Sequence, residues 1–238
     1  MHLTLKPIGR VASRGVGAAV ALAAMSYGSW VLWSWARYGR ASHPKREDAD
    51  RLLDQFMPVY DVAERHHVRV NAPADVTLAA ATEMDLEQSP LARAIFRARE
   101  LIMGGRTARR PEPRGLLAQM RSLGWGVLAE APGREIVMGA VTQPWNARVV
   151  FRALPPTAFA AFDEPNYVKI AWTLRVDPVG PQQSAFRTET RVIATDPVAR
   201  SRFRRYWAFV SPGVILIRRL SLGPLKREAE SRARSRVP

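Results

Sequence analysis

The chain has 238 residues, of which 47% are hydrophobic and 24% charged, so a largely disordered chain is excluded. It has no cysteine, which excludes disulfides, thiolate nucleophiles and cysteine metal ligands. The net charge of +15 comes from basic residues spread along almost the whole length without a nucleic-acid-binding motif. Anionic lipid headgroups are therefore a better expected partner for this charge than nucleic acid.

The first element is a run without charge over residues 15–35, GVGAAVALAAMSYGSWVLWSW. Its length is close to the roughly 20 residues that a helix needs to cross a bilayer. Basic residues flank the run on both sides, and its tyrosine and tryptophan residues cluster toward the C-terminal end, as in an interfacial belt. We therefore expect a basic tail at residues 1–14 and a single membrane-spanning anchor at residues 15–36.

Two other interpretations of this run stay open. Ala21 and Ala23 are small residues at the spacing of a signal-peptidase site, which would make the segment a cleaved signal peptide. The run could also be a buried helix of the globular domain. If it is an anchor, a slight excess of basic residues after it favours a cytoplasmic domain. Residues 37–61 are then a polar juxtamembrane linker.

The folded part begins with an alternating pattern. Residues 64–71 alternate between polar and apolar side chains, which predicts a half-buried strand. An Ala-rich helix is expected over residues 74–84, and a second helix over residues 89–103, opened by a serine cap and a proline. Residues 106–114 are charged and contain prolines, which predicts a mobile loop, and residues 116–123 predict a short helix.

After residue 124 the hydrophobic pattern has a period of two, and short turn-forming stretches separate several of the apolar runs. Consecutive strands with short turns predict an antiparallel meander. The expected strands cover residues 126–131, 135–142, 157–163, 168–177 and 184–195, and residues 148–153 are a candidate for one more.

A long helix is predicted at the end of the chain. Asp196 supplies an N-cap and Pro197 a favourable first helical position. Pro212 must kink or interrupt this helix, and the apolar stretch 214–222 after it either packs on the sheet or touches the membrane. Aromatic side chains recur at helical spacing before the proline: Phe203, Tyr206 and Trp207.

Three stretches of sequence accompany this order of elements: NAPADVTLAA after the first strand, GREIVMGAV in the middle, and TETRVIATDPVARSRFRRYW into the last helix. The order and these stretches resemble the helix-grip fold of the START-like, or polyketide cyclase (SRPBCC), superfamily. The resemblance implies an α+β domain at residues 62–232, followed by a tail at 233–238, in which an antiparallel curved sheet wraps a long C-terminal helix. In that superfamily the space between sheet and helix usually takes a lipid, sterol, polyketide or other apolar molecule.

A sheet that closes on a helix needs one apolar face. The even-numbered residues of 170–176 are apolar and should face the helix, and the even-numbered residues of 186–192 should match them on the next strand. The other face then carries charged side chains. Among these, Glu189 is expected across from Arg175 in an exposed ion pair.

The candidate ligand-binding residues are bulky rings with a few polar tips among them. Such a group either fills a core or lines a pocket, and the large number of rings for one layer favours a pocket. The candidates are Trp145, Phe159, Phe162, Trp172, Thr188, Thr190, Phe203, Tyr206 and Trp207.

Signatures of catalysis are weak. His66 and His67 are neighbours on a strand, so their side chains point to opposite faces and cannot bind one metal ion together. One of them could enter the cavity as an acid or base. The sequence has no paired-carboxylate, nucleophile-elbow or phosphate-loop motif, so we expect no catalytic residue, no metal site and no cofactor.

These observations favour a single-pass membrane protein whose domain binds or carries a hydrophobic small molecule or lipid in an internal cavity. One alternative is a cyclase- or aromatase-type enzyme acting on a polyketide-like substrate, with His67, Arg191 or Tyr206 in a polar cluster. The other is a non-catalytic membrane scaffold with a filled core.

Overall fold

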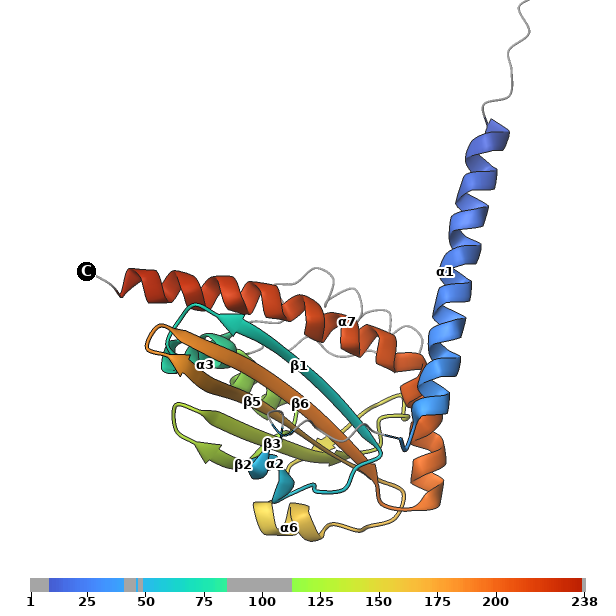
Figure 1. Ribbon diagram of the computed structural model, residues 1–238. Helices are drawn as coiled ribbons and strands as arrows, with labels where there is room; N and C mark the ends of the chain where they lie inside the picture. The colour runs from blue at the N-terminus through green and yellow to red at the C-terminus, as the bar shows by residue number, and fades with distance from the viewer. Residues whose placement is uncertain (1–8, 41–45, 47–48, 85–112, 237–238) are drawn as a thin grey trace, which may run out of the picture.

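The computed structural model describes residues 9–40, 46, 49–84 and 113–236 of the chain (Figure 1). The predicted helix at 89–103 and most of the predicted loop at 106–114 lie outside the described residues. The helices are α1 (Gly9–Arg37), α2 (Arg51–Asp54), α3 (Ala74–Glu83), α5 (Leu116–Ser122), α6 (Pro156–Ala161) and α7 (Pro197–Ser235). The strands are β1 (Val62–Val70), β2 (Gly126–Ala131), β3 (Glu135–Thr142), β4 (Phe151–Arg152), β5 (Val168–Gly180) and β6 (Gln183–Ala194).

The strands form one antiparallel sheet in the order β1-β6-β5-β3-β2, with the short β4 paired to β3. The expected meander is confirmed, because β2, β3, β5 and β6 are successive neighbours. Strand β1 completes the sheet by pairing with β6 along its whole length, from Val62 opposite Val192 to Val70 opposite Ser184. This last pairing joins segments that are more than a hundred residues apart in the chain.

One predicted strand is wrong. Residues 157–163 do not join the sheet, because Pro156–Ala161 forms the short helix α6. Pro155 and Pro156 explain the difference, since proline has the backbone angle of a first helical turn and has no N–H to give to a neighbouring strand. The further strand expected at 148–153 is reduced to the two residues of β4.

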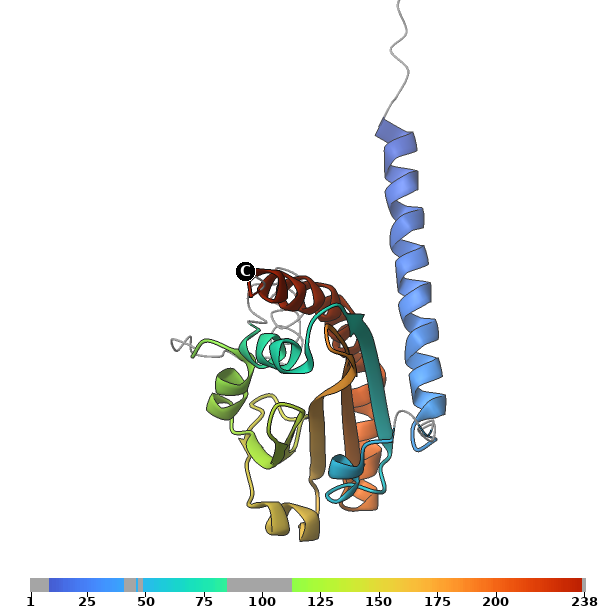
Figure 2. The ribbon, with the colours of Figure 1, turned by 60° about the vertical axis from the view of Figure 1, so that its left-hand side comes forward.

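The sheet has an inner face and an outer face, each covered by helices. The inner face packs against α3, α5 and the C-terminal half of α7, as Figure 2 shows end-on, with a core that includes Trp172, Leu174 and Leu225. The outer face packs against α2 and α6, where Leu53 and Phe159 are fully buried. The α+β helix-grip arrangement, an antiparallel sheet on a long C-terminal helix, is therefore present.

Helix α7 is continuous but bent. It contains Pro212 and Pro224, and Figure 1 shows it rise beside α1 and then turn across the sheet. Proline lacks the N–H that bonds the preceding turn, so a kink at Pro212 is expected, and the helix is not interrupted. Among the residues that the structure describes, α7 is the one helix long and apolar enough to cross a membrane by length and composition, with 22% of its most apolar window buried.

Helix α1 leaves the domain instead of entering its core. The hydroxyl of Tyr27 donates to the carbonyl oxygen of Phe209 at 2.6 Å, and the hydroxyls of Ser34 and Ser211 lie 3.0 Å apart. The C-terminal third of α1 thus packs on the first half of α7. Residues 21–27 are exposed, and the helix continues away from the domain (Figures 1 and 2). This exposure argues against a buried core helix.

Candidate functional site

Two neighbouring rows of the inner face are polar, while the rows on either side are apolar. In one polar row Glu64 of β1 lies opposite Thr190 of β6, and in the next His66 lies opposite Thr188. The flanking rows pair Val62 with Val192 and Val68 with Phe186. Trp172 of β5 continues the row of Thr190. We call Glu64, His66, Thr188 and Thr190 the polar island.

Helix α7 places an arginine over this island. The side of α7 that meets the sheet carries Leu225 and Ala229 of the core, and the buried Ile215 falls on the same side. Arg218 falls on the same side by helical spacing. Its Nη1 donates to Oγ1 of Thr188 at 3.4 Å, and the arginine is half-buried. One basic side chain thus interrupts the apolar stripe where α7 crosses the island.

Two buried polar atoms of the island have no hydrogen-bond partner among the residues that the structure describes. They are Nε2 of His66 and Oγ1 of Thr190, each on a side chain whose residue is 9% exposed. Buried polar atoms are nearly always paired, because leaving one unpaired costs about 1–3 kcal/mol. These two atoms therefore mark a place where a ligand with polar groups would restore the missing bonds.

The charges of the island are set by burial. Burial, together with the positive charges of Arg218 and Arg219, lowers the pKa of His66 to about 4, so the imidazole is neutral at pH 7. Burial raises the pKa of Glu64, while Arg218 opposes that shift. Burial also lowers the pKa of Arg218 to about 10, which leaves it charged at neutral pH. The polar island and Arg218 together thus offer a guanidinium, a neutral imidazole, two hydroxyls and the carboxyl group of Glu64.

Seven of the nine predicted ligand-binding residues lie on or beside the inner face. Thr188, Thr190 and Trp172 belong to or adjoin the polar island. The other four form or contact a ring cluster where α7 begins, in which Phe203 stacks on Trp207 with centroids 5.9 Å apart. These four residues are Trp145, Phe203, Tyr206 and Trp207.

Phe159 and Phe162 do not join the other seven. They pack on the outer face, in or against the cluster that contains Leu53 and Met57. Since helix α6 replaces the strand predicted there, both rings lie on the side of the sheet opposite α7. They cannot line a space between the sheet and α7.

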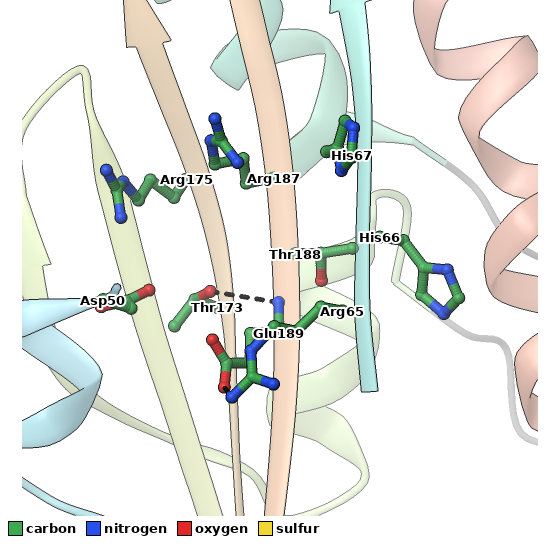
Figure 3. A pocket seen from close by; sticks show the side chains of 9 residues that line it. All are labelled: Asp50, Arg65, His66, His67, Thr173, Arg175, Arg187, Thr188 and Glu189. Carbon is green, nitrogen blue, oxygen red and sulfur yellow. Dashed lines mark hydrogen bonds and ion pairs between the residues drawn. The ribbon is translucent and has the colours of Figure 1, made fainter. Parts of the chain in front are cut away.

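The polar residues suggested for a cyclase-type site are also divided between the faces. His66 is buried on the inner face, whereas His67 is exposed and points to the outer face (Figure 3). Arg191 lies on the outer face as well. Of the two adjacent histidines, it is therefore His66 that could contact a ligand beneath α7.

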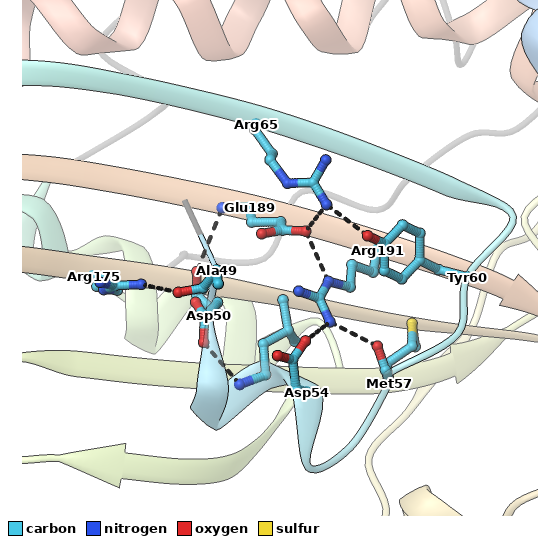
Figure 4. Close-up of polar contacts among 11 residues, drawn as sticks. Ala49, Asp50, Asp54, Met57, Tyr60, Arg65, Arg175, Glu189 and Arg191 are labelled. Atoms are coloured by element: carbon cyan, nitrogen blue, oxygen red, sulfur yellow. Dashed lines mark hydrogen bonds and ion pairs between the residues drawn. The ribbon is translucent and has the colours of Figure 1, made fainter. Parts of the chain in front are cut away.

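Arg191 is the centre of a buried network on the outer face (Figure 4). Its Nε donates to Glu189 at 2.7 Å, and its Nη1 donates to Asp54 at 2.5 Å and to the carbonyl oxygen of Met57 at 2.8 Å. Arg65 also pairs with Glu189, at 2.7 Å. This corrects the predicted pair of Glu189 with Arg175, because the register places Arg65 opposite Glu189.

The network holds the segment before β1 against the sheet. The carbonyl oxygen of Ala49 accepts from Arg175 at 2.7 Å, and Asp50 caps α2 by accepting from the amide of Leu53 at 2.8 Å. Part of the stretch predicted as a linker, residues 37–61, is therefore bound to the domain. Its charged contacts fasten the chain, and their partners are already present.

Two hollows bounded by described residues lie elsewhere. One, of about 40 Å³, lies between β1, β6 and β5, is lined mainly by outer-face charged side chains such as Arg175 and Arg187, and also borders His66 and Thr188 of the polar island (Figure 3). Its volume accommodates water and not a ligand of metabolite size. The other is an open depression along the C-terminal half of α7, near Pro224 and Arg227. Neither lies between the polar island and α7.

The candidate site thus combines residues that the sequence pattern suggested with others that it missed. Thr188 and Thr190 were expected as polar tips. Glu64 and Arg218 were not, although counting helical turns from Trp207 through Ser211 would have put Arg218 on the side of α7 that faces the sheet. Among the described residues no group of three or more His, Asp or Glu side chains is close enough to hold a metal ion.

No protein-family model and no curated protein matches the sequence. Three solved structures match over most of the chain. The ZhuI aromatase/cyclase from a Streptomyces species is 13% identical with a TM-score of 0.25, covering 72% of this chain and 94% of its own. A START superfamily protein from Mycobacterium smegmatis is 14% identical with a TM-score of 0.26, covering 73% and 97%.

The third, the di-domain aromatase/cyclase BexL, is 16% identical with a TM-score of 0.25. The match covers 71% of this chain and 46% of BexL. All three are proteins of the superfamily that the sequence resembles. At these identities and TM-scores the matches say nothing about ligand or reaction, and the arrangement of sheet and helix rests on the strand order and on α7 themselves.

Proposed function

We propose that this chain binds an apolar small molecule or lipid between the inner face of the sheet and α7, with the polar head of the ligand at the polar island. Helix α1 serves as the membrane anchor. The protein therefore takes up or carries a hydrophobic molecule at a membrane.

The observation that carries the proposal is the pair of unpartnered buried atoms, Nε2 of His66 and Oγ1 of Thr190, beside the half-buried charge of Arg218. A filled core would cover this part of the sheet with apolar side chains, as it does in the rows on either side. A ligand with a carboxylate, phosphate or hydroxyl head would instead bind Arg218 and pair with both atoms, while its apolar body contacts Trp172 and its neighbours.

Helix α7 is placed so that it can admit such a ligand. It is held to the sheet near both ends, by Phe203 and Trp207 at the start and by Leu225 and Ala229 later on. The stretch between these contacts follows the bend at Pro212 and crosses the island. A small outward movement of this stretch would open the space without breaking either terminal contact.

Binding is better supported than catalysis. Burial keeps His66 neutral at physiological pH, so it would serve there as a hydrogen-bond partner or a weak base rather than as a general acid. His67 and Arg191, which a cyclase-type site was expected to use, lie on the outer face. A scaffold with a filled core would not require polar side chains at the polar island, where the neighbouring rows of the same face are apolar.

The anchoring role of α1 is supported by its length and exposure. It is a helix from Gly9 to Arg37, and residues 21–27 are exposed although they are mostly apolar. Such a surface is stable in lipid and unfavourable in water. The tryptophans near its C-terminal end suit the interfacial zone of a bilayer.

Native mass spectrometry of the full chain, purified in mild detergent, tests the proposal. We expect an apolar molecule bound in a one-to-one ratio in the wild type and in Arg219→Gln, whose side chain is exposed, and loss of most of it in Arg218→Gln. Repeated absence of any bound molecule, with no binding of the fluorescent fatty acid 11-(dansylamino)undecanoate, would reject the ligand-binding role.

A further inference from the structure

The side of α7 that faces away from the sheet is apolar in its middle. Phe209, Leu216 and Leu220 are 60%, 44% and 47% exposed. Their spacing of seven and four residues puts them on one face of the helix, opposite the buried Ile215 and Leu225. We call Phe209, Leu216 and Leu220 the outer stripe.

Basic residues extend the outer stripe at both ends. Arg205 precedes Phe209 by one helical turn, and Arg227 follows Leu220 by two turns, so both fall on the same side of α7. Both are exposed. An apolar stripe between arginines is the pattern of a helix that lies in the plane of an anionic membrane surface, with rings and leucines among the acyl chains and guanidinium groups at the phosphates.

The direction of α1 indicates the same surface. Its contact with α7 begins at Tyr27, and beyond that point α1 rises on the side of α7 that faces away from the sheet (Figures 1 and 2). Residues 9–26 precede this contact and rise about 27 Å at roughly 1.5 Å per residue, with Arg10 and Arg14 in the first two turns of α1. The hydrocarbon core of a bilayer is roughly 30 Å thick.

The aromatic residues of α1 lie where the two helices meet. Trp30 and Trp33 have ring centroids 5.2 Å apart, and Nε1 of Trp30 donates to Ser211 at 3.4 Å, beside the bend of α7. Trp33, like Tyr27, is 47% exposed. Amphipathic rings gather at the headgroup level of a membrane, so this level coincides with the outer stripe.

We infer that α7 is a membrane-surface helix. Its outer stripe lies in the headgroup region of an anionic leaflet, and α1 crosses the bilayer with the residues before Tyr27, where the length of an arginine side chain allows Arg10 and Arg14 to reach toward the headgroups of the opposite leaflet. This inference rests on the proposed anchoring role of α1. In this orientation the polar island lies directly beneath the helix that touches the lipid, so a ligand reaches it from the leaflet and does not cross water.

Because the chain has no cysteine, each cysteine that is introduced is the single site for labelling. Single cysteines are introduced as Gly17→Cys in α1, where an added Cβ meets open space, Leu216→Cys and Leu220→Cys in the outer stripe, and Leu123→Cys elsewhere. Leu123 is the matched control because its exposure, 45%, equals that of the stripe residues. The full chain is labelled with the environment-sensitive fluorophore NBD and reconstituted into vesicles of phosphatidylcholine and phosphatidylserine. Nitroxide quenchers are placed either at the lipid headgroup or deep in the acyl chain.

We expect blue-shifted emission from labels at 216 and 220 that the headgroup quencher reduces, emission from position 17 that the deep quencher reduces, and water-like emission from position 123. If 17 is deep while 216 and 220 resemble 123, the inference about α7 is overturned and the anchor stands. If position 17 is also in water, anchoring fails and the inference fails with it.

Discussion

Two buried arginines, one on each face of the sheet, differ in what surrounds them. Arg191 on the outer face is fully buried, and Glu189, Asp54 and the carbonyl oxygen of Met57 accept from it. Burial lowers its pKa, but the two carboxylates more than offset that effect, so the net pKa is raised. Of the three guanidinium nitrogens of Arg191, Nη2 has no hydrogen-bond partner among the described residues.

Arg218 on the inner face has one long hydrogen bond, 3.4 Å to Thr188, and its pKa is lowered by burial with only Glu64 opposing. The acidic side chains Glu189 and Asp54 therefore pair with Arg191, the arginine that fastens α2 to the sheet. The arginine over the polar island, Arg218, has only one long hydrogen bond to the residues that the structure describes. Buried charge with its partners present indicates a structural role, and buried charge without them indicates a binding role.

The largest expected effect is a difference in unfolding free energy between variants of the two arginines. Arg191→Met should lower the free energy of unfolding by about 3–5 kcal/mol, because it breaks the buried ion network that joins Glu189 to Asp54 and leaves Arg65 as the remaining partner of Glu189. Arg218→Met should change it by less than about 1 kcal/mol, since an apolar side chain of similar length relieves an unpaired charge. Urea unfolding of both variants in detergent provides the measurement. Equal losses in the two variants would remove the distinction between the faces.

The second effect concerns pH and the two adjacent histidines. The pKa of His66 is about 4 in the folded protein, below its ordinary 6.5, so protonation favours the unfolded chain. Its contribution to stability is complete above pH 6.5 and is lost as the pH falls toward 4, by roughly 1–3 kcal/mol. His66→Gln should therefore flatten the decline of stability between pH 6.5 and 4.

The matched control for this pH profile is His67→Gln, on the exposed outer side of the same strand. It should follow the wild-type profile of unfolding free energy against pH. A profile that flattens in His67→Gln but not in His66→Gln would show that the two side chains are assigned to the wrong faces.

The smallest expected effect compares two buried threonines. The hydroxyl of Thr77 lies 2.8 Å from that of Ser184, and both are buried, so Thr77→Val should cost about 1–2 kcal/mol of unfolding free energy. The hydroxyl of Thr190 has no partner among described residues, so Thr190→Val should be neutral or slightly stabilising without ligand. Thermal unfolding of both variants checks this. A comparable loss in Thr190→Val would mean that its hydroxyl is already bonded within the protein.

The sequence pattern predicted those parts of the fold that depend only on residues close to one another in the chain. Alternation on β5 and β6 correctly assigned the inner face, including Thr188 and Thr190, because a period of two follows from strand geometry. The same rule failed at Phe159, where two prolines start a helix and outweigh the alternation. Arg218 was not predicted, because residues 214–222 have the pattern of one apolar stretch in which the helical face of a single arginine does not stand out.

The remaining errors come from pairings between distant segments. Whether His66 or His67 enters the inner face depends on the register of β1 against β6, which no local pattern contains. The predicted pair of Glu189 with Arg175 failed for the same reason, since Arg187 lies opposite Arg175 on the neighbouring strand. The polar island is formed by these long-range pairings, so its members could be proposed only in part before the sheet was known.

The most direct test of the central claim is a titration of the full chain, in nanodiscs, with 11-(dansylamino)undecanoate. This probe has an apolar chain and a carboxylate that Arg218 would bind. The account predicts that Arg218→Met weakens binding by about 10-fold or more, the loss of a charged hydrogen bond, while Arg219→Met matches the wild type. Equal affinity in both variants, or no binding to any of the three proteins, would contradict it.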